Sequence, residues 1–239
     1  MLCSTRGILF HRINYSESSV IAKIYTEKFG LRTYLVRGAK KPKSGKQRYL
    51  QPLALLDLEV YEKEKSEIQN IKEIRFEKIY KSLTTDIVKS SLLLFINELL
   101  YKAIREEESN RELFQFIRNG LILLDESETY LNFHLSFAIQ LTKFLGFYPK
   151  NNYSGNRTFF HLEEGEFQPK STTDELQLNP RLGRDLSEIL KVPLEDHATL
   201  QLSNQQRISL LAAMIRFYEL HLPGFRNIKS HQILREVLS

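Results

Sequence analysis

The N-terminal part of the chain alternates hydrophobic and polar positions with the period of two that is typical of β-strands. Turn-forming residues separate these stretches, and Lys28, Phe29 and Gly30 make one such short connection. The expected strands cover residues 6–13, 19–26, 31–37, 53–61 and 68–76. Five strands of this length are enough for a small barrel. The pattern favours a five-stranded OB-fold, with an SH3-like barrel as the alternative.

From about residue 82 the hydrophobic period changes to 3.6, which indicates helices. We expect one helix over residues 86–105 and a second from the capping box of Ser109 and Glu112 to residue 124. A third helix is expected to end at Gly146. Shorter helices are expected over residues 180–190, after Ser203, and over residues 230–238. An irregular stretch at about residues 148–179 contains a predicted hairpin near residues 163–166. The expected fold is therefore α+β with two domains, an OB-fold β-barrel in residues 1–80 and an all-α helical domain with a small inserted hairpin region in residues 81–239.

Positive charge is concentrated in the first of these domains. Residues 1–80 hold 16 Lys and Arg against 9 Asp and Glu, a net charge of +7, whereas residues 81–239 hold 18 against 20, a net charge of −2. Residues 28–56 contain eight basic side chains and no acidic one. Such a cluster creates a field that attracts polyanions, although a basic loop can also serve solubility alone.

Residues 38–51 form a connection of 14 residues, which is far longer than a hairpin needs. Five basic residues lie on it, and its glycines and proline disfavour regular structure, so we expect a mobile arm that contacts phosphates. Tyr34, on the preceding strand, could stack on a base or fill the core. The predicted DNA-binding residues are Arg32, Tyr34, Arg37, Lys40, Lys41, Lys43, Lys46 and Arg48.

Catalytic and metal-binding patterns are missing from the sequence. The stretch Ser44-Gly45-Lys46 is followed by Gln47, so it does not make the phosphate loop of a nucleotide hydrolase. Cys3 and His11 lack a third group that would make them a nucleophile and base. Because Cys3 is the only cysteine, we expect a reducing cytoplasm and no multi-cysteine metal site. Because the catalytic and metal-binding motifs are missing, we expect no catalytic residues, no bound metal and no cofactor. The longest apolar run has six residues, so no membrane association is expected.

Four stretches resemble, in order and spacing, the N-terminal domain of the bacterial RecO family: residues 7–9, 14–18, 36–44 and 50–52. Residues 145–149, 217–222 and 228–230 are similar to the family's helical part. The resemblance implies a non-enzymatic recombination mediator that binds single- and double-stranded DNA and anneals complementary strands. It further implies work in the cytoplasm, at the nucleoid, with a RecR-type protein and the C-terminal tail of single-strand-binding protein. The alternative is an adaptor whose basic loop and helical pocket bind an acidic peptide.

The sequence departs from the family in one region. Many relatives bind zinc with two C-x-x-C pairs after the position of Pro149, whereas residues 151–179 contain no cysteine. Because that site needs thiolates, we expect no zinc in this chain. Phe159, Phe160 and Phe167 are expected to hold the hairpin instead. The sequence leaves open the preference for single or double strands, the oligomeric state, and the residues that meet the protein partners.

Overall fold

A computed structural model describes residues 1–63, 66–105, 107–169 and 176–238 of the chain. Its residues fall into two compact units, Met1–Thr84 with Leu100–Asp125, and Thr85–Leu99 with Glu126–Ser239. The barrel and α2 (Arg111–Glu126) therefore share most of the first unit. The domain boundary near residue 80 remains a proposal. A fragment that ends there would contain the barrel without α2, which belongs to the same unit.

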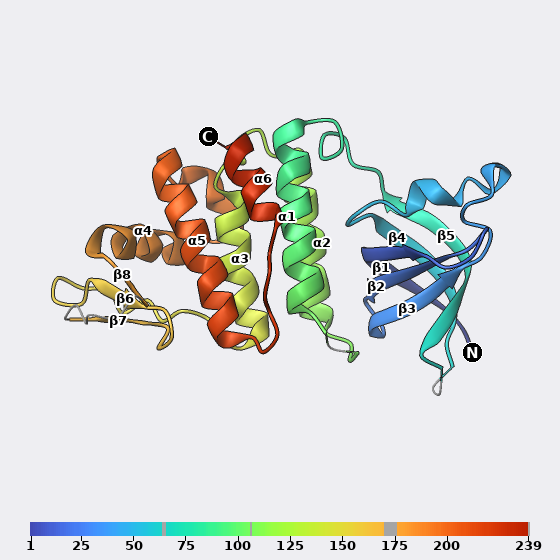
Figure 1. The fold of residues 1–239 in the computed structure, drawn as a ribbon, viewed down its shortest axis with the longest axis horizontal. Coiled ribbons are helices and arrows are strands. Elements are labelled where there is room, and N and C mark those ends of the chain that lie inside the picture. The colour runs from blue at the N-terminus through green and yellow to red at the C-terminus, as the bar shows by residue number, and fades with distance from the viewer. Residues whose placement is uncertain (64–65, 106, 170–175, 239) are drawn as a thin grey trace. The chain divides into compact units, whose positions relative to one another are not determined.

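The first unit contains five strands that close into a barrel in the order β1-β2-β3-β5-β4 (Figure 1). Neighbouring strands are antiparallel except β3 and β5, which pair in parallel through Thr33 to Leu35 and Ile68 to Asn70. The strands are β1 (Leu2–Asn14), β2 (Val20–Thr26), β3 (Gly30–Val36), β4 (Leu55–Tyr61) and β5 (Ile68–Lys78). The predicted OB-like barrel is thus confirmed.

Alternating strand positions fill the interior of the barrel. Ile24, Leu56 and Val60 are completely buried there. Gly7 on β1 lies so close to Ile24 and Leu58 that a Cβ atom would approach them to 2.6 and 2.9 Å. A larger residue at position 7 would push these core side chains aside, so glycine is required by packing at this point of β1.

Helix α2 packs on the barrel within the first unit. The ring of Phe114 lies 6.3 Å from that of Tyr25, and Arg118 forms an ion pair with Glu77 at the end of β5. The helix begins at Arg111, and the side chain of Asn110 accepts a hydrogen bond from the N–H of Leu113 at 2.9 Å. The prediction that Ser109 caps this helix is therefore wrong by one residue, because asparagine is an equally good N-cap.

The second unit is built around α3 (Phe133–Leu145), which is buried from Phe133 to Thr142. The hydroxyl of Tyr218 on α5 (Asn204–His221) donates to the carbonyl of Ala138 at 2.6 Å. The predicted capping box of Ser203 and Gln206 is present at the start of α5. Gly146 ends α3 in the left-handed conformation, with φ of 84°, as predicted. The other helices are α1 (Ile87–Ala103), α4 (Pro180–Lys191) and α6 (Ser230–Val237).

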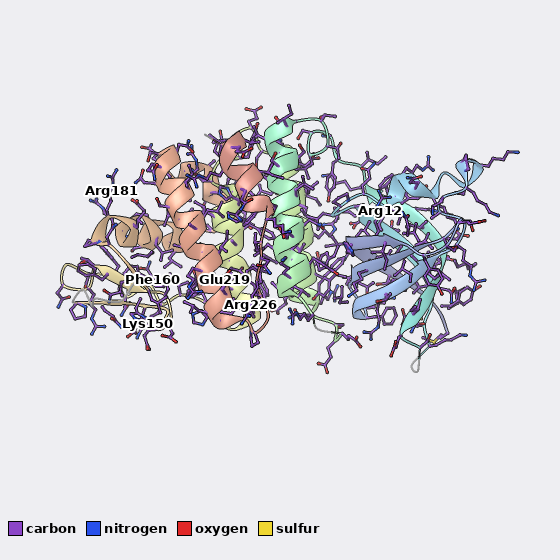
Figure 2. The ribbon with its side chains drawn as sticks, viewed as in Figure 1. Arg12, Lys150, Phe160, Arg181, Glu219 and Arg226 are labelled. Carbon is purple, nitrogen blue, oxygen red and sulfur yellow. The ribbon has the colours of Figure 1, made fainter. Side chains whose placement is uncertain are left out.

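The irregular stretch contains the predicted hairpin, formed by β6 (Phe159–His161) and β7 (Glu166–Gln168). A third strand, β8 (Gln177–Leu178), pairs with the other edge of β6 and was not predicted. Phe160 is buried and its ring lies 5.0 Å from that of Phe167 (Figure 2). Phe167 in turn contacts Tyr153 at 5.3 Å, whereas Phe159 is only half-buried. Aromatic packing by Phe160 and Phe167 therefore holds this hairpin, as expected.

Candidate nucleic-acid interface

The long connection between β3 and β4 is ordered by two short 3-10 turns, Pro42–Ser44 and Lys46–Tyr49 (Figure 1). Gly45 joins them with a φ of 61°, in the left-handed region that favours glycine. Ala39 and Leu50, near its two ends, are buried in the barrel core. These apolar side chains fix both ends of the loop to the barrel, and the expectation that its glycines and proline prevent regular structure is wrong for the two turns between them.

Six basic side chains project from this loop: Arg37, Lys40, Lys41, Lys43, Lys46 and Arg48, which we call the loop cations. All are exposed except Lys46, which is half-exposed. Lys40 donates to the carbonyl of Ser16 at 2.9 Å, and Lys46 donates to the carbonyl of Arg37 at 3.2 Å. These two bonds hold the amino groups in place and leave their positive charge unneutralised.

The loop cations have no carboxylate partner within ion-pair distance among the residues that the structure describes. Ser16, whose carbonyl accepts from Lys40, belongs to the turn between β1 and β2. Glu17, the next residue of this turn, forms no ion pair with Lys40. Six exposed or half-exposed cations of one sign therefore form a positive surface at one end of the barrel.

Tyr34 lies inside the barrel and not on its surface. It is completely buried, and its hydroxyl donates to the carboxylate of Glu62 at 2.7 Å. Burial, reinforced by the nearby Glu62 carboxylate, raises the pKa of Tyr34. Tyr34 therefore fills the core and does not stack on a base, because its ring has no exposed surface. The prediction of Tyr34 as a DNA-binding residue is wrong.

Arg32 is separated from the loop cations. It precedes the end of β3 by four residues, or roughly 13 Å along an extended strand. Its guanidinium donates to the backbone carbonyl of Glu107 at 2.7 Å. It lines a different groove of about 1540 Å³, which also contains Lys23, Tyr101 and the acidic Glu62. The structure therefore does not place Arg32 in the same surface as the loop.

Cys3 and His11 do not form a catalytic pair. Both lie on β1, eight residues apart, which corresponds to roughly 26 Å along an extended strand. The ring of His11 stacks on Tyr101 at 4.7 Å, and burial together with Lys23 lowers its pKa. In the part of the chain that the structure describes, no cluster of three or more His, Cys, Asp or Glu side chains could bind a metal ion. No helix among the described residues is long and apolar enough to cross a membrane.

One contact of the loop was not singled out from the sequence. The guanidinium carbon of Arg48 lies 4.7 Å from the centre of the Tyr49 ring, and this ring lies 4.7 Å from that of Phe76. Tyr49 is next to the basic cluster in sequence, but Phe76 comes from β5, which lies between β3 and β4 in the sheet. Only the fold brings Phe76 beneath the loop.

Comparison with known proteins gives the same family along the whole chain. Residues 1–80 match the family described as Recombination protein O N terminal, and residues 84–231 match Recombination protein O C terminal. The chain is 34% identical to DNA repair protein RecO of Flavobacterium psychrophilum over 241 residues, covering all of both chains. It is 34% identical to that of Flavobacterium johnsoniae over 248 residues, again covering both, and 28% identical to that of Porphyromonas gingivalis over 98% of each. The chain, with its barrel, its basic loop and its helical part, is thus a member of the RecO family of DNA repair proteins.

Proposed function

We propose that this protein binds single- and double-stranded DNA through the loop cations and anneals complementary strands without catalysing a covalent reaction. The observation that carries the proposal is the uncompensated positive surface on the loop between β3 and β4. Lysine and arginine side chains that touch phosphates release condensed counterions, and this release drives binding to any sequence. The same neutralisation reduces the repulsion between two strands, which is the step that annealing needs.

The family supports a set of partners for this activity. Relatives across the whole length are named DNA repair proteins. We therefore propose that the chain acts in the cytoplasm, at the nucleoid, with a RecR-type protein and the C-terminal tail of single-strand-binding protein. The tail is acidic, so it competes with DNA only if it uses the loop cations. A labelled tail peptide that is displaced by oligonucleotide would indicate that the loop serves as a peptide site, which was the alternative reading of the sequence.

The test of the proposal is the salt dependence of DNA binding. The informative variant is the double substitution Lys41→Ala and Lys43→Ala, because both side chains are exposed and form no ion pair with a described residue. Loss of two phosphate contacts should reduce the slope of log affinity against log salt by about 1.4 for single strands and about 1.8 for duplex. Fluorescence anisotropy of labelled oligonucleotides in a salt series measures these slopes.

A matched control removes two positive charges elsewhere. Arg181, labelled in Figure 2, and Arg184 are exposed near the start of α4 and belong to the second unit. Their joint replacement by Ala changes the net charge by the same amount and should leave the slopes within about 0.3 of the parent protein. If both double variants reduced the slopes equally, the effect would come from net charge alone and the loop would have no special role.

Annealing provides a second readout of the same surface. The Lys41→Ala, Lys43→Ala variant should anneal two complementary oligonucleotides more slowly than the parent at low salt, because less phosphate charge is neutralised. The rate should approach that of protein-free strands as salt is raised. An unchanged annealing rate together with unchanged slopes would refute the proposed role of the loop.

A further inference from the structure

We infer that Arg48 and Tyr49 form a platform on which one unpaired base stacks, so that the loop distinguishes single strands from duplex. This inference rests on the proposed DNA binding by the loop and names the form of DNA that this part of the loop recognises. The inference is based on the geometry of Arg48, which differs from that of the other loop cations.

The guanidinium of Arg48 is held in a defined orientation. Its carbon lies 4.7 Å from the centre of the Tyr49 ring, and its Nη2 donates to the Tyr49 hydroxyl at 2.6 Å. A cation above an aromatic ring and a hydrogen bond to the hydroxyl of the same residue act together to restrict the planar group. The four loop lysines have no planar head group, and the guanidinium of Arg37 contacts no aromatic ring of the described residues, so none of them offers an equivalent surface.

The barrel supports this pair from below. Tyr49 is half-buried against the hydrophobic core, and its ring lies 4.7 Å from that of Phe76 on β5 at an angle of 58°. Leu50, the next residue, is completely buried and fixes the end of the 3-10 turn. The tyrosine ring is therefore a fixed base for Arg48 and not a freely rotating surface side chain.

The outer face of the guanidinium remains available for a ligand. The Nη2 edge of the group is turned to the Tyr49 hydroxyl, while Arg48 as a whole is exposed and forms no ion pair with a carboxylate of the described residues. A flat, exposed, cationic face next to phosphate-binding lysines fits a nucleobase, because bases stack on arginine planes as well as on aromatic rings.

Apolar side chains continue past the end of β5. Ile79 is 72% exposed, and a notch of about 50 Å³ that it lines is also lined by Pro52, Phe76 and Tyr80. Because Phe76 also contacts the ring of Tyr49, apolar atoms on this side of the pair favour the faces of bases over a second phosphate. In duplex DNA the base faces are covered by stacking, so a duplex can use only the charge of Arg48.

The decisive variant is Arg48→Lys, which keeps the charge and removes the plane. Affinity for single-stranded oligonucleotide should fall at least fivefold, whereas duplex affinity should change by less than about twofold. Salt slopes for both should stay the same, because the number of positive charges is unchanged. Binding of an oligonucleotide with 2-aminopurine in place of single bases should change the probe's fluorescence in the parent protein and much less in the variant.

Two further variants control the experiment. Arg12→Lys makes the same exchange at an exposed position on β1, outside the loop, and should alter neither affinity (Figure 2). Tyr49→Phe keeps the ring but removes the hydroxyl that orients Arg48, so it should weaken single-strand binding by about two- to fourfold without an effect on duplex.

The outcomes separate this inference from the proposed function. The platform is refuted if Arg48→Lys changes the single-strand and duplex affinities equally, or if it changes neither affinity. The salt slopes of the Lys41→Ala, Lys43→Ala variant would still test the role of the loop in that case. If those slopes are also unchanged, the proposed function fails as well. A loss confined to single strands in Arg48→Lys, with Arg12→Lys unaffected, supports the platform.

Discussion

The side-chain carboxylate of Asp125 accepts a hydrogen bond from the backbone N–H of Ser82 at 2.8 Å, across 43 residues of sequence. The N–H groups of Lys81 and Leu83 donate to the same carboxylate at 2.9 to 3.0 Å. Asp125 is 3% exposed and lies at the end of α2. One buried charge thus holds the chain that leaves β5 against the helix that packs on the barrel.

We expect Asp125→Asn to lower the free energy of unfolding by about 1 to 3 kcal/mol, because the amide lacks the negative charge that strengthens these bonds and has no second oxygen to accept from the N–H of Lys81. Urea denaturation followed by circular dichroism measures this loss. Asp196→Asn, at an exposed position before α5, is the matched control and should change stability by less than about 0.5 kcal/mol. Equal stability of the two variants would contradict the role of Asp125.

The effect of Asp125 should also depend on pH. Burial by itself would raise the pKa of Asp125, but the hydrogen bonds from Lys81, Ser82 and Leu83 outweigh it and hold the pKa below its usual value. A carboxylate with a lowered pKa stabilises the fold fully above its unfolded pKa of about 3.9, and this contribution is lost as the pH falls towards the folded value. The difference between the parent and Asp125→Asn should therefore be constant from pH 7 to 5 and shrink below about pH 4.

Tyr34 should behave as a core residue. Tyr34→Leu should lower stability by about 2 to 5 kcal/mol, since it leaves a cavity, and Tyr34→Phe by about 1 kcal/mol, since it removes only the bond to Glu62. Single-strand affinity should stay within about twofold of the parent for both variants at a temperature where each is folded. Anisotropy titration checks this, and a loss of affinity in Tyr34→Leu alone would point to a stacking role.

Aromatic packing in the hairpin should account for its stability without metal. Phe167 is completely buried between Tyr153 and Phe160, so Phe167→Ala should lower the free energy of unfolding by about 3 to 5 kcal/mol. Phe159→Ala, on the same hairpin but half-buried, should cost less than half as much. Adding a chelator should leave the melting temperature of the parent protein unchanged. A drop in melting temperature on chelation would show that a metal ion contributes to folding.

His134 should make the second unit sensitive to acid. Burial, followed by repulsion from Arg207, lowers its pKa to about 3, so the folded state keeps the ring neutral while the unfolded chain takes up a proton below about pH 6.5. Stability contributed by the neutral ring is thus complete above pH 6.5 and falls as the pH drops towards 3. The substitution His134→Leu should remove this pH dependence. Between pH 7 and 5 the free energy of unfolding of the parent should fall by roughly 2 kcal/mol more than that of the variant. Denaturant titrations at both pH values measure the difference.

Local patterns were sufficient for most of the secondary structure. The five strands were predicted to within a few residues because the alternation of apolar side chains depends only on neighbouring positions. The stop of α3 at Gly146 and the capping box at Ser203 are likewise local, since each involves hydrogen bonds within one helical turn. The family resemblance also came from short stretches of sequence, and it holds along the whole chain.

The candidate site depended on contacts between distant residues. Alternation placed Arg32 and Tyr34 on one face of β3, but only the folded barrel shows that Tyr34 is buried inside it while Arg32 lines a groove. The loop was expected to lack regular structure because of its glycines and proline, whereas it contains two 3-10 turns between Ala39 and Leu50, which are buried in a core formed by other strands.

The sequence by itself therefore determined the strands, the helices, the family and the position of the uncompensated positive charge. The tertiary structure decided which basic residues share a surface, that Tyr34 belongs to the core, and that Phe76 from β5 supports Tyr49 under Arg48. The physical reason is that periodicity and charge are properties of consecutive residues, whereas burial and orientation depend on side chains from other strands that only the closed barrel brings together.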